Sequence, residues 1–218
     1  MKRFIRAALA LVVVLGCTCC NMVRGSGVEA EETRQVPQFS RMEIDGSYVV
    51  KINVDKNGKD TVALKISGDD NILPLIDTEV SDGKLTVKSD KNLSFNDPLS
   101  LVVNPADMEE LKLNGSGDVV INGIDNKKTA VIIAGSGDVK LAGKTGTLRL
   151  EIAGSGDIDA IELIADEVVV EIAGSGEMSV CAEKNLDVEI AGSGTVNYYC
   201  NPAEVKQDIT GSGELVKK

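Results

Sequence analysis

The sequence predicts an all-β protein whose repeated units stack as a parallel β-helix, a single-stranded solenoid. The first observation is a Gly-Ser-Gly triplet that recurs at intervals of 20, 19, 20, 18 and 19 residues, beginning at Gly115, Gly135, Gly154, Gly174, Gly192 and Gly211. A near-fixed spacing of this kind is typical of a chain built from stacked units. The second observation is that apolar and polar residues alternate between the triplets, whereas no stretch shows a sustained helical period.

The alternation continues through the triplet, as residues 148–160 show. Side chains in a strand point alternately to its two faces. The inward set predicted from this register is Leu148, Leu150, Ile152, Gly154, Gly156, Ile158 and Ala160. The outward set is Arg149, Glu151, Ser155, Asp157 and Asp159. Inward glycines lack a Cβ, so they would let the chain bend sharply over the core.

The length of the repeat favours a coil over a sheet of separate hairpins. A unit of 18 to 20 residues with one such corner is too long for a single straight strand. It suits one turn of a coil that buries its apolar face only when neighbouring turns stack on it. The alternative is an antiparallel β-meander or sandwich, for which residues 124–129 and 143–146 could supply tight turns.

The β-helical domain is predicted to span residues 37–218, with the Gly-Ser-Gly repeats in 111–216. Upstream of the repeats, Asp82-Gly83 is a turn signal between two short strands within 79–88. Residues 71–76 form a brief apolar run, broken by Pro74, that predicts a short helical turn. Further strands are predicted from alternation at 48–54, 61–66 and 99–103.

The N-terminus predicts export. Residues 1–16 combine a basic start with a short apolar run, which is typical of a signal peptide and too short for an ordinary membrane span. Val14-Leu15-Gly16-Cys17 resembles the lipobox of bacterial lipoproteins. This resemblance implies cleavage before Cys17 and lipidation of its thiol, so the predicted partner at this end is a membrane. Residues 17–36 are polar and are interpreted as a lipidated flexible tether.

Two further cysteines, Cys181 and Cys200, lie 19 residues apart, which is one repeat. Stacking could bring them together, and an exported protein can form disulfides. However, Cys181 lies seven residues after the start of its triplet and Cys200 lies eight residues after the start of its own, so strand alternation would point them to opposite faces. The sequence therefore leaves both a disulfide and two separately placed small residues open.

Composition excludes several classes of function. The net charge is −11, which argues against nucleic acid as a partner because phosphates attract Lys and Arg. The chain contains no histidine, which removes the usual general base and the commonest transition-metal ligand. It contains no tryptophan for stacking against sugars. No catalytic, cofactor-binding or metal-binding residues are predicted, and the chain is not expected to be an enzyme.

Stacking predicts columns of polar side chains beside the corners. One of these columns is acidic, and its like charges would repel one another. Calcium could relieve that repulsion, but it needs six to eight oxygen ligands, more than one acid in each turn provides. A solvated edge partly screened by lysines is the favoured interpretation. The predicted acidic column is Asp118, Asp138, Asp157 and Glu177, interrupted at Thr195. A second column holds the triplet serines, and parity places one of Tyr198 and Tyr199 inward and the other outward.

Three segments resemble one bacterial family, the head (GIN) domain of auto-transporter adhesins. They are Phe39 to Val50, Asn71 to Val87, and Leu111 to Val119 with the later triplets. The resemblance covers about residues 36 to 216. It implies a right-handed parallel β-helix on the cell envelope of a Bacteroidetes-type bacterium, and it brings no catalytic residues.

The resulting hypothesis is a non-enzymatic outer-membrane lipoprotein, surface-exposed or periplasmic, that acts as an adhesin through its repeated β-faces. The alternative is a β-helix protein that binds or degrades glycans. The ligand, protein or glycan, and the oligomeric state are left open. Lys217 and Lys218 are interpreted as charges that protect the last strand from edge pairing.

Overall fold

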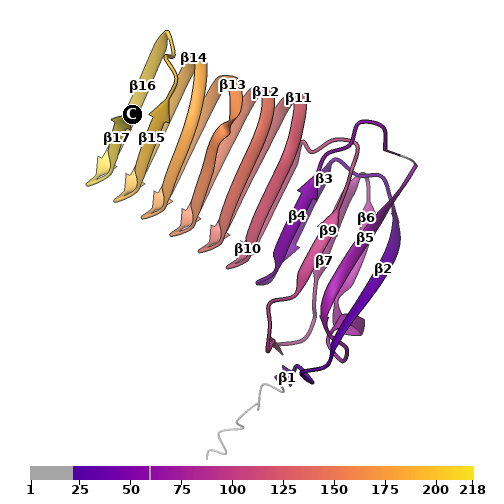
Figure 1. Cartoon of the computed structure of the whole chain (residues 1–218). Helices are drawn as coiled ribbons and strands as arrows, with labels where there is room; N and C mark the ends of the chain where they lie inside the picture. The colour runs from indigo at the N-terminus through magenta and orange to yellow at the C-terminus, as the bar shows by residue number, and fades with distance from the viewer. Residues whose placement is uncertain (1–21, 59) are drawn as a thin grey trace, which may run out of the picture.

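A computed structural model describes residues 22–58 and 60–218, and it confirms the all-β solenoid (Figure 1). Four long strands pair with one another in parallel along most of their lengths: β11 (Asp118–Gly135), β12 (Asp138–Gly154), β13 (Asp157–Gly174) and β14 (Glu177–Gly192). β10 (Glu110–Gly115) precedes them, and β15 (Thr195–Tyr199), β16 (Glu204–Gly211) and β17 (Glu214–Lys217) follow, all in parallel pairing. The antiparallel alternative is therefore wrong for the repeats.

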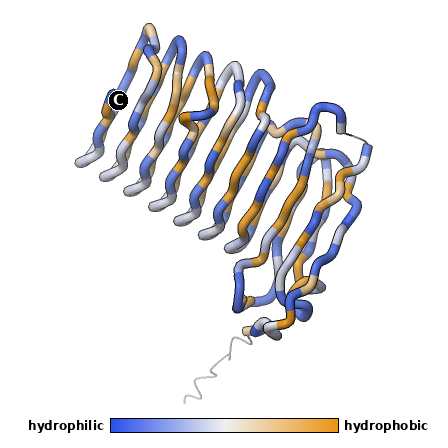
Figure 2. The backbone as a smooth tube through the Cα atoms, in the orientation of Figure 1, coloured by the Kyte–Doolittle hydropathy of each residue, from blue (hydrophilic) through white to orange (hydrophobic). Residues whose placement is uncertain are grey.

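Each long strand follows one face of the solenoid, turns, and returns along the other face. Figure 2 shows the two kinds of turn along opposite edges. The Gly-Ser-Gly corners form a near-white row along one edge, and turns that are mostly polar follow the other. We call these edges the corner edge and the variable edge. The two faces enclose a single core.

The core consists of aliphatic columns, as the inward register predicts. Leu150 and Ile152 are buried, and so are Ile158 and Ala160 beyond the corner. Their stacked equivalents in neighbouring coils are buried too, for example Val131, Val170 and Val188 in register with Leu150. Each buried aliphatic side chain contributes about 1.5–3 kcal/mol relative to its exposed state. Neighbouring coils are therefore held together mainly by these columns and by the parallel ladder.

At the corners, the structure corrects the predicted role of the first glycine. Gly156 is buried on the core face, as expected, but Gly154 is only half-buried and has φ +140°. A Cβ on Gly154 would lie 2.1 Å from the carbonyl oxygen of Gly135 in the coil beneath. Glycine is needed here because a neighbouring backbone occupies the space, and not only because the chain bends over the core. The same carbonyl accepts a hydrogen bond from the Ser155 N–H at 2.9 Å.

A seventh corner lies outside the recognised repeats. Gly46, between β3 (Arg41–Asp45) and β4 (Val49–Asn53), has φ +145°. A Cβ on Gly115 would lie 2.3 Å from its carbonyl oxygen. Tyr48 takes the place of the second glycine, and it is buried with its ring edge-on to Phe95. The missing glycine hides this corner from a search for the triplet.

The first coils do not stack in chain order. β3 and β4 pair with β10 and β11, and also with β7 (Lys84–Lys88) and β9 (Ser100–Val103) on their other side. An earlier segment thus lies between two later ones, which spacing alone does not indicate.

Antiparallel strands finish this end of the solenoid. β6 (Asp77–Ser81) forms a hairpin with β7 through Asp82 and Gly83, both at positive φ, as the turn signal predicts. β5 (Thr61–Asp69) pairs with β9 and with β2 (Glu29–Pro37). The short helical turn predicted within 71–76 is a 3₁₀ helix, η1 (Leu73–Leu75).

The prediction of a flexible tether over 17–36 is wrong for its described part. Residues 29–37 form β2 in full register with β5, and β1 (Val23–Arg24) pairs with β8 (Leu93–Ser94). The polar composition of this stretch reflects an edge strand, most of whose side chains face solvent. Its backbone pairs with residues 24 to 40 positions further along the chain. Residues 1–21 lie outside the described residues.

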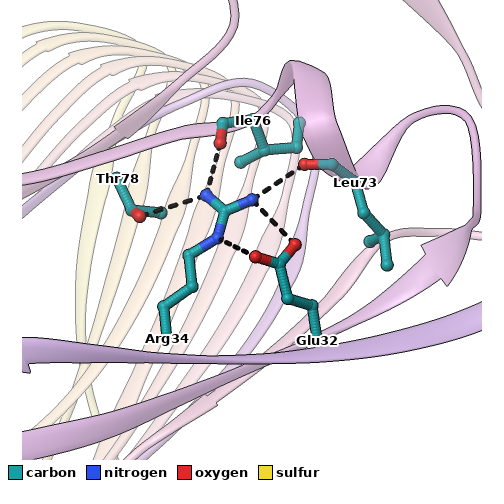
Figure 3. A network of polar contacts seen from close by, with 5 residues as sticks. All are labelled: Glu32, Arg34, Leu73, Ile76 and Thr78. Carbon is teal, nitrogen blue, oxygen red and sulfur yellow. Dashed lines mark hydrogen bonds and ion pairs between the residues drawn. The ribbon is translucent and has the colours of Figure 1, made fainter.

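Arg34 ties β2 to η1 and β6 (Figure 3). Its Nη1 donates to the Ile76 carbonyl at 2.5 Å and to Thr78 Oγ1 at 3.1 Å, and its Nη2 donates to the Leu73 carbonyl at 2.9 Å. Glu32 accepts from Nε and Nη2 and balances the charge. The guanidinium thus binds the carbonyl of the first residue of η1 and that of its C-cap residue, Ile76.

Asp69 fastens the N-terminal segment at the same end. Its side chain is buried, and Oδ1 accepts hydrogen bonds from the Gly27 N–H at 2.7 Å and from Asn96 Nδ2 at 3.3 Å. Burial acts to raise the pKa of this carboxyl, but the hydrogen bonds from Gly27 and Asn96 outweigh it and lower the pKa. The ionised carboxylate therefore stabilises the docked segment.

The corner contact predicts a large effect of Gly174→Ala. The new Cβ would lie 2.0 Å from the Gly154 carbonyl oxygen, at φ +145°. We expect a loss of more than about 3 kcal/mol in the free energy of unfolding, measured by urea denaturation. Gly83→Ala is the control, since Gly83 has φ +72° but open space around its missing Cβ, and it should cost about 1–2 kcal/mol. Equal losses for the two variants would contradict the contact argument.

Asp69 predicts a component of acid sensitivity. A carboxyl whose pKa is lower in the folded state than its ordinary 3.8 stabilises the fold above that value, and this stability is lost as the pH falls through the folded pKa. Asp69→Asn should therefore flatten the loss of stability between pH 5 and pH 2 or so, measured by chemical denaturation at each pH. Asp77→Asn, an exposed carboxylate at the same end, is the matched control. An unchanged slope in Asp69→Asn would refute the assignment.

Candidate functional site

The predicted acidic column is present in register. Asp118, Asp138, Asp157 and Glu177 are stacked partners, and Thr195 follows them. Screening by lysines is not what relieves it, because no ion pair within residues 22–58 and 60–218 involves these four acids. The Glu177 N–H donates to Asp157 Oδ1 at 2.9 Å, and Asn197 Nδ2 donates to Glu177 Oε1 at 2.6 Å. Amide donors thus partner part of the column.

The column does not assemble a metal site. Throughout the described part of the chain, no three acidic, histidine or cysteine side chains converge closely enough to hold an ion. Successive acids are separated by one coil, about 4.8 Å, and all face outward. The triplet serines also face outward. The N–H groups of Ser136, Ser155, Ser175, Ser193 and Ser212 continue the ladder between corners.

Cys181 and Cys200 form a disulfide, with Cα atoms 5.3 Å apart. Strand parity alone would point the two cysteines to opposite faces. Cys181 is in register with Tyr199, and Cys200, the residue after Tyr199, has φ +68°. This left-handed conformation returns the chain toward the preceding coil. Tyr198 and Tyr199 are both half-buried, so the simple division into one inward and one outward tyrosine does not hold.

The variable edge differs from the corner edge in its irregular turns. The shifts in strand register within the coils fall here, between Ile121 and Ile124, Lys140 and Ala142, and Ala160 and Ile164, among others. Gly-Ser-Gly corners cannot change length without breaking their carbonyl contacts. The turns on the variable edge are free of that constraint, so distinct surface features arise on this edge.

Two adjoining hollows on this edge share Asp125 and Asn126, and we call them together the variable-edge groove. The first has a volume of about 580 Å³ and is also lined by Lys56, Ala106, Asp107, Glu109, Lys127 and Lys128. The second, of about 340 Å³, is also lined by Lys144, Thr145, Gly146, Ile164, Asp166 and Glu183. The groove therefore combines lysines, acids, an amide and one large aliphatic side chain, Ile164.

Asp125 is the electrostatic centre of the groove. Lys56 Nζ lies 2.6 Å from its carboxylate and Lys144 Nζ lies 3.5 Å from it. The hydrogen bond from Lys56 lowers the pKa of Asp125 against a smaller opposing effect of burial, and Lys144 adds to the lowering. Two ammonium groups thus converge on one ionised carboxylate.

A buried polar cluster supports the base of the groove. Asn126 Nδ2 donates to Asp107 Oδ1 and to the Met108 carbonyl, each at 3.0 Å. Its Oδ1 accepts from Thr129 Oγ1 at 3.0 Å and from Thr145 Oγ1 at 2.8 Å. Both threonines are buried in a mostly aliphatic solenoid. Every polar group of Asn126 has a partner, so its side chain is held in one orientation.

Ile164 gives the groove an apolar wall. Its side chain is 47% exposed and that of Ile161, in the same turn, is 37% exposed. Large aliphatic side chains are otherwise mostly buried in the coils. Lys127 and Lys128 are exposed on the other side of Asn126. The arrangement suits a ligand with hydroxyl or charged groups and an apolar patch.

Sequence reasoning missed this groove. Asp125-Asn126-Lys127-Lys128 was visible only as a polar turn between two strands. Lys56 and Lys144 come from distant positions, so only stacking brings them to Asp125. The one site residue predicted from the sequence, Cys17, lies outside the described residues. Among the residues that are described, no helix has the length and apolar character to cross a membrane.

The fold and the groove define a parallel β-solenoid with a ligand-sized recess on one edge. The family model described as "Putative auto-transporter adhesin, head GIN domain" matches residues 38–202, so the chain belongs to this family. The family description implies a protein of the cell surface or envelope and gives no enzymatic activity. No curated protein matches the chain.

Solved structures show the same fold. One from Bacteroides fragilis NCTC 9343, described as a putative adhesin, is 23% identical with a TM-score of 0.74, covering 90% of this chain and 100% of that chain. One from Parabacteroides distasonis ATCC 8503, described as a putative lipid binding protein, is 22% identical with a TM-score of 0.62, covering 90% and 99%. A putative adhesin from Parabacteroides merdae ATCC 43184 is 20% identical, with a TM-score of 0.57 and the same coverage.

Proposed function

We propose that this chain is a non-enzymatic, adhesin-like lipoprotein of the cell envelope, anchored through Cys17. The observation that carries the proposal is the arrangement of the two ends of the solenoid. The N-terminal segment is docked on one end through β1, β2 and Asp69, and the C-terminal coil lies at the opposite end (Figure 1). An anchor at Cys17 would hold one end at the membrane and present the other.

The distance from the anchor to the folded domain is short. Five peptide units separate Cys17 from Met22, and these span at most about 18 Å when fully extended. The folded end would therefore stand close to the bilayer. Exposed Met22 and Val28, 63% and 56% exposed, lie at this end. The tether is shorter than composition predicts because the segment after Met22 belongs to the fold.

The charge distribution favours an outward orientation. Residues 150–218 contain 14 of the 34 acids but only four of the 23 basic residues. Anionic membrane surfaces repel such a segment over roughly a Debye length. The coils farthest from the anchor are therefore kept away from the bilayer and available to a partner.

Cys17→Ala tests the anchor. The variant should leave the membrane fraction and appear in the soluble fraction, because its single lipid attachment residue is gone. Fractionation followed by immunoblotting measures this, with Cys19→Ala as the control that should stay membrane-bound. If Cys17→Ala sediments with membranes as the unaltered chain does, the anchoring proposal fails.

The groove favours glycan binding as the form that adhesion takes. Its paired acids and lysines and the fixed amide of Asn126 offer both donors and acceptors to hydroxyl groups, and Ile164 offers an apolar contact to a sugar face. Repeated flat faces alone would favour a protein partner. A recess with converging polar side chains is what distinguishes the glycan hypothesis.

A glycan array on the full chain tests this form. For any glycan that binds, the double variant Lys127→Glu/Lys128→Glu should lower affinity at least tenfold, or about 1.4 kcal/mol. Lys112→Glu, at a half-buried position on β10 that lines neither hollow, should leave binding unchanged. Binding that is equally weakened by Lys112→Glu, or an array with no bound glycan, would contradict a glycan site in the groove.

A further inference from the structure

The last coil leaves two strand edges open. Among the described residues, β16 pairs only with β14, and β17 pairs only with β15. The opposite end is closed differently, because Arg34 joins β2 to η1 and β6 there. An open edge carries unpaired N–H and C=O groups that can pair with another strand.

The core positions of β16 are only partly covered: Val205 and Gln207 are exposed and Ile209 is half-buried. Val205, Gln207 and Ile209 are in register with the buried Leu186, Val188 and Ile190. Val205 is 40% exposed. Gln207 places an amide where the earlier coils have valine or leucine. This end of the core thus presents apolar side chains around one hydrogen-bonding group.

The charge of the last coil also differs from that of the coils before it. Residues 150–199 contain eleven acids and one basic residue, whereas residues 200–218 contain three acids and three lysines. Strong like charge opposes contact between the sides of two molecules. The terminal coil carries no such barrier to contact between ends.

β16 is self-complementary when it is paired antiparallel to a second copy of itself about Gln207. Lys206 then faces Asp208 of the second copy, and Asp208 faces its Lys206. Val205 faces Ile209, and the two Gln207 amides meet on the two-fold axis. Opposite charges and apolar pairs facing each other across antiparallel strands stabilise the pairing. Every one of these residues lies on the described edge strand.

Neighbouring registers are unfavourable. Inward residues of one copy must stay opposite inward residues of the other. The nearest registers that keep this rule are centred on residue 206 or on residue 208. The next registers place Lys206 opposite Lys206 or Asp208 opposite Asp208. Like charges directly opposite each other destabilise a strand pair. The charges therefore select the register centred on Gln207.

β17 is the guarded edge. It ends in Lys217, whose Nζ donates to Asn201 Oδ1 at 3.1 Å, and Lys218 follows. Lysines on an edge strand oppose pairing, which agrees with the role expected of them from the sequence. One strand of the coil is thus protected and the other is complementary to itself.

We propose that two copies of this chain associate end to end, through antiparallel pairing of their β16 strands about Gln207. The contact is isologous, so it closes a dimer and does not extend into a fibre. The two acidic solenoid bodies then point away from each other, and both N-terminal ends remain free. The inference is independent of the ligand, and with the proposed anchor at Cys17 it joins copies held by two facing membranes.

Cysteine crosslinking of the full chain carrying Cys17→Ala, which leaves both N-terminal ends free of the proposed anchor, tests the pairing in solution. The contact is only one coil wide, so the dimer would be short-lived. Crosslinking suits such a contact because each covalent bond that forms traps the dimer. Gln207→Cys should give a covalent dimer on a non-reducing gel after mild oxidation, because the two thiols meet on the axis. Thr210→Cys is the matched control on the same strand, since the two copies would be about 20 Å apart. A dimer of equal yield from Thr210→Cys, or none from Gln207→Cys, would overturn the proposal.

A charge exchange in the Gln207→Cys background provides the second test. Lys206→Glu places Glu opposite Asp208 at two points and should lower the crosslinked fraction at least fivefold. The combined Lys206→Glu/Asp208→Lys exchange restores opposite charges across the axis and should restore the yield. Circular dichroism and thermal unfolding confirm that each variant is folded. A folded exchange variant that stays uncrosslinked would sink the proposed register.

Discussion

The structure depends on direct contact between the backbones of stacked corners. The Gly154 carbonyl oxygen accepts the Ser175 N–H at 2.9 Å, and the same oxygen would lie 2.0 Å from a Cβ on Gly174. The Gly154 carbonyl oxygen thus accepts the hydrogen bond that continues the ladder, and it also occupies the space that a side chain at position 174 would need. Because this contact recurs at the corners that begin at Gly135, Gly154, Gly174, Gly192 and Gly211, the coils are locked to one spacing along one edge.

This constraint separates the two edges by their freedom to vary. A change at the corner edge would disturb two neighbouring coils, whereas the turns of the variable edge absorb shifts in register without opening the core. The groove around Asp125 and Asn126 lies on the free edge, and the uniform columns of serine and acid lie beside the fixed one. A rigid scaffold with a varied edge is the usual arrangement for a binding protein.

Much of the coil could be predicted from residues 148–160, because side chains alternate with a period of two whatever the neighbours are. The same rule placed Asp138 and Asp157 in one column, although it could not show that Asn197 and a backbone N–H partner part of that column. The groove escaped prediction because Lys56, Asp125 and Lys144 meet only through stacking. Cys200 escaped it because a single left-handed residue reverses strand parity.

By itself, the sequence determined the repeat, the inward and outward faces and the aliphatic core, since spacing and alternation are local properties of the chain. The tertiary structure decided which segments become neighbours. It inserted β3 and β4 between later strands, made residues 29–37 an edge strand, and left β16 open at the far end. These outcomes depend on hydrogen bonds and packing between residues far apart in the chain, and no local pattern records which distant strand satisfies a given backbone.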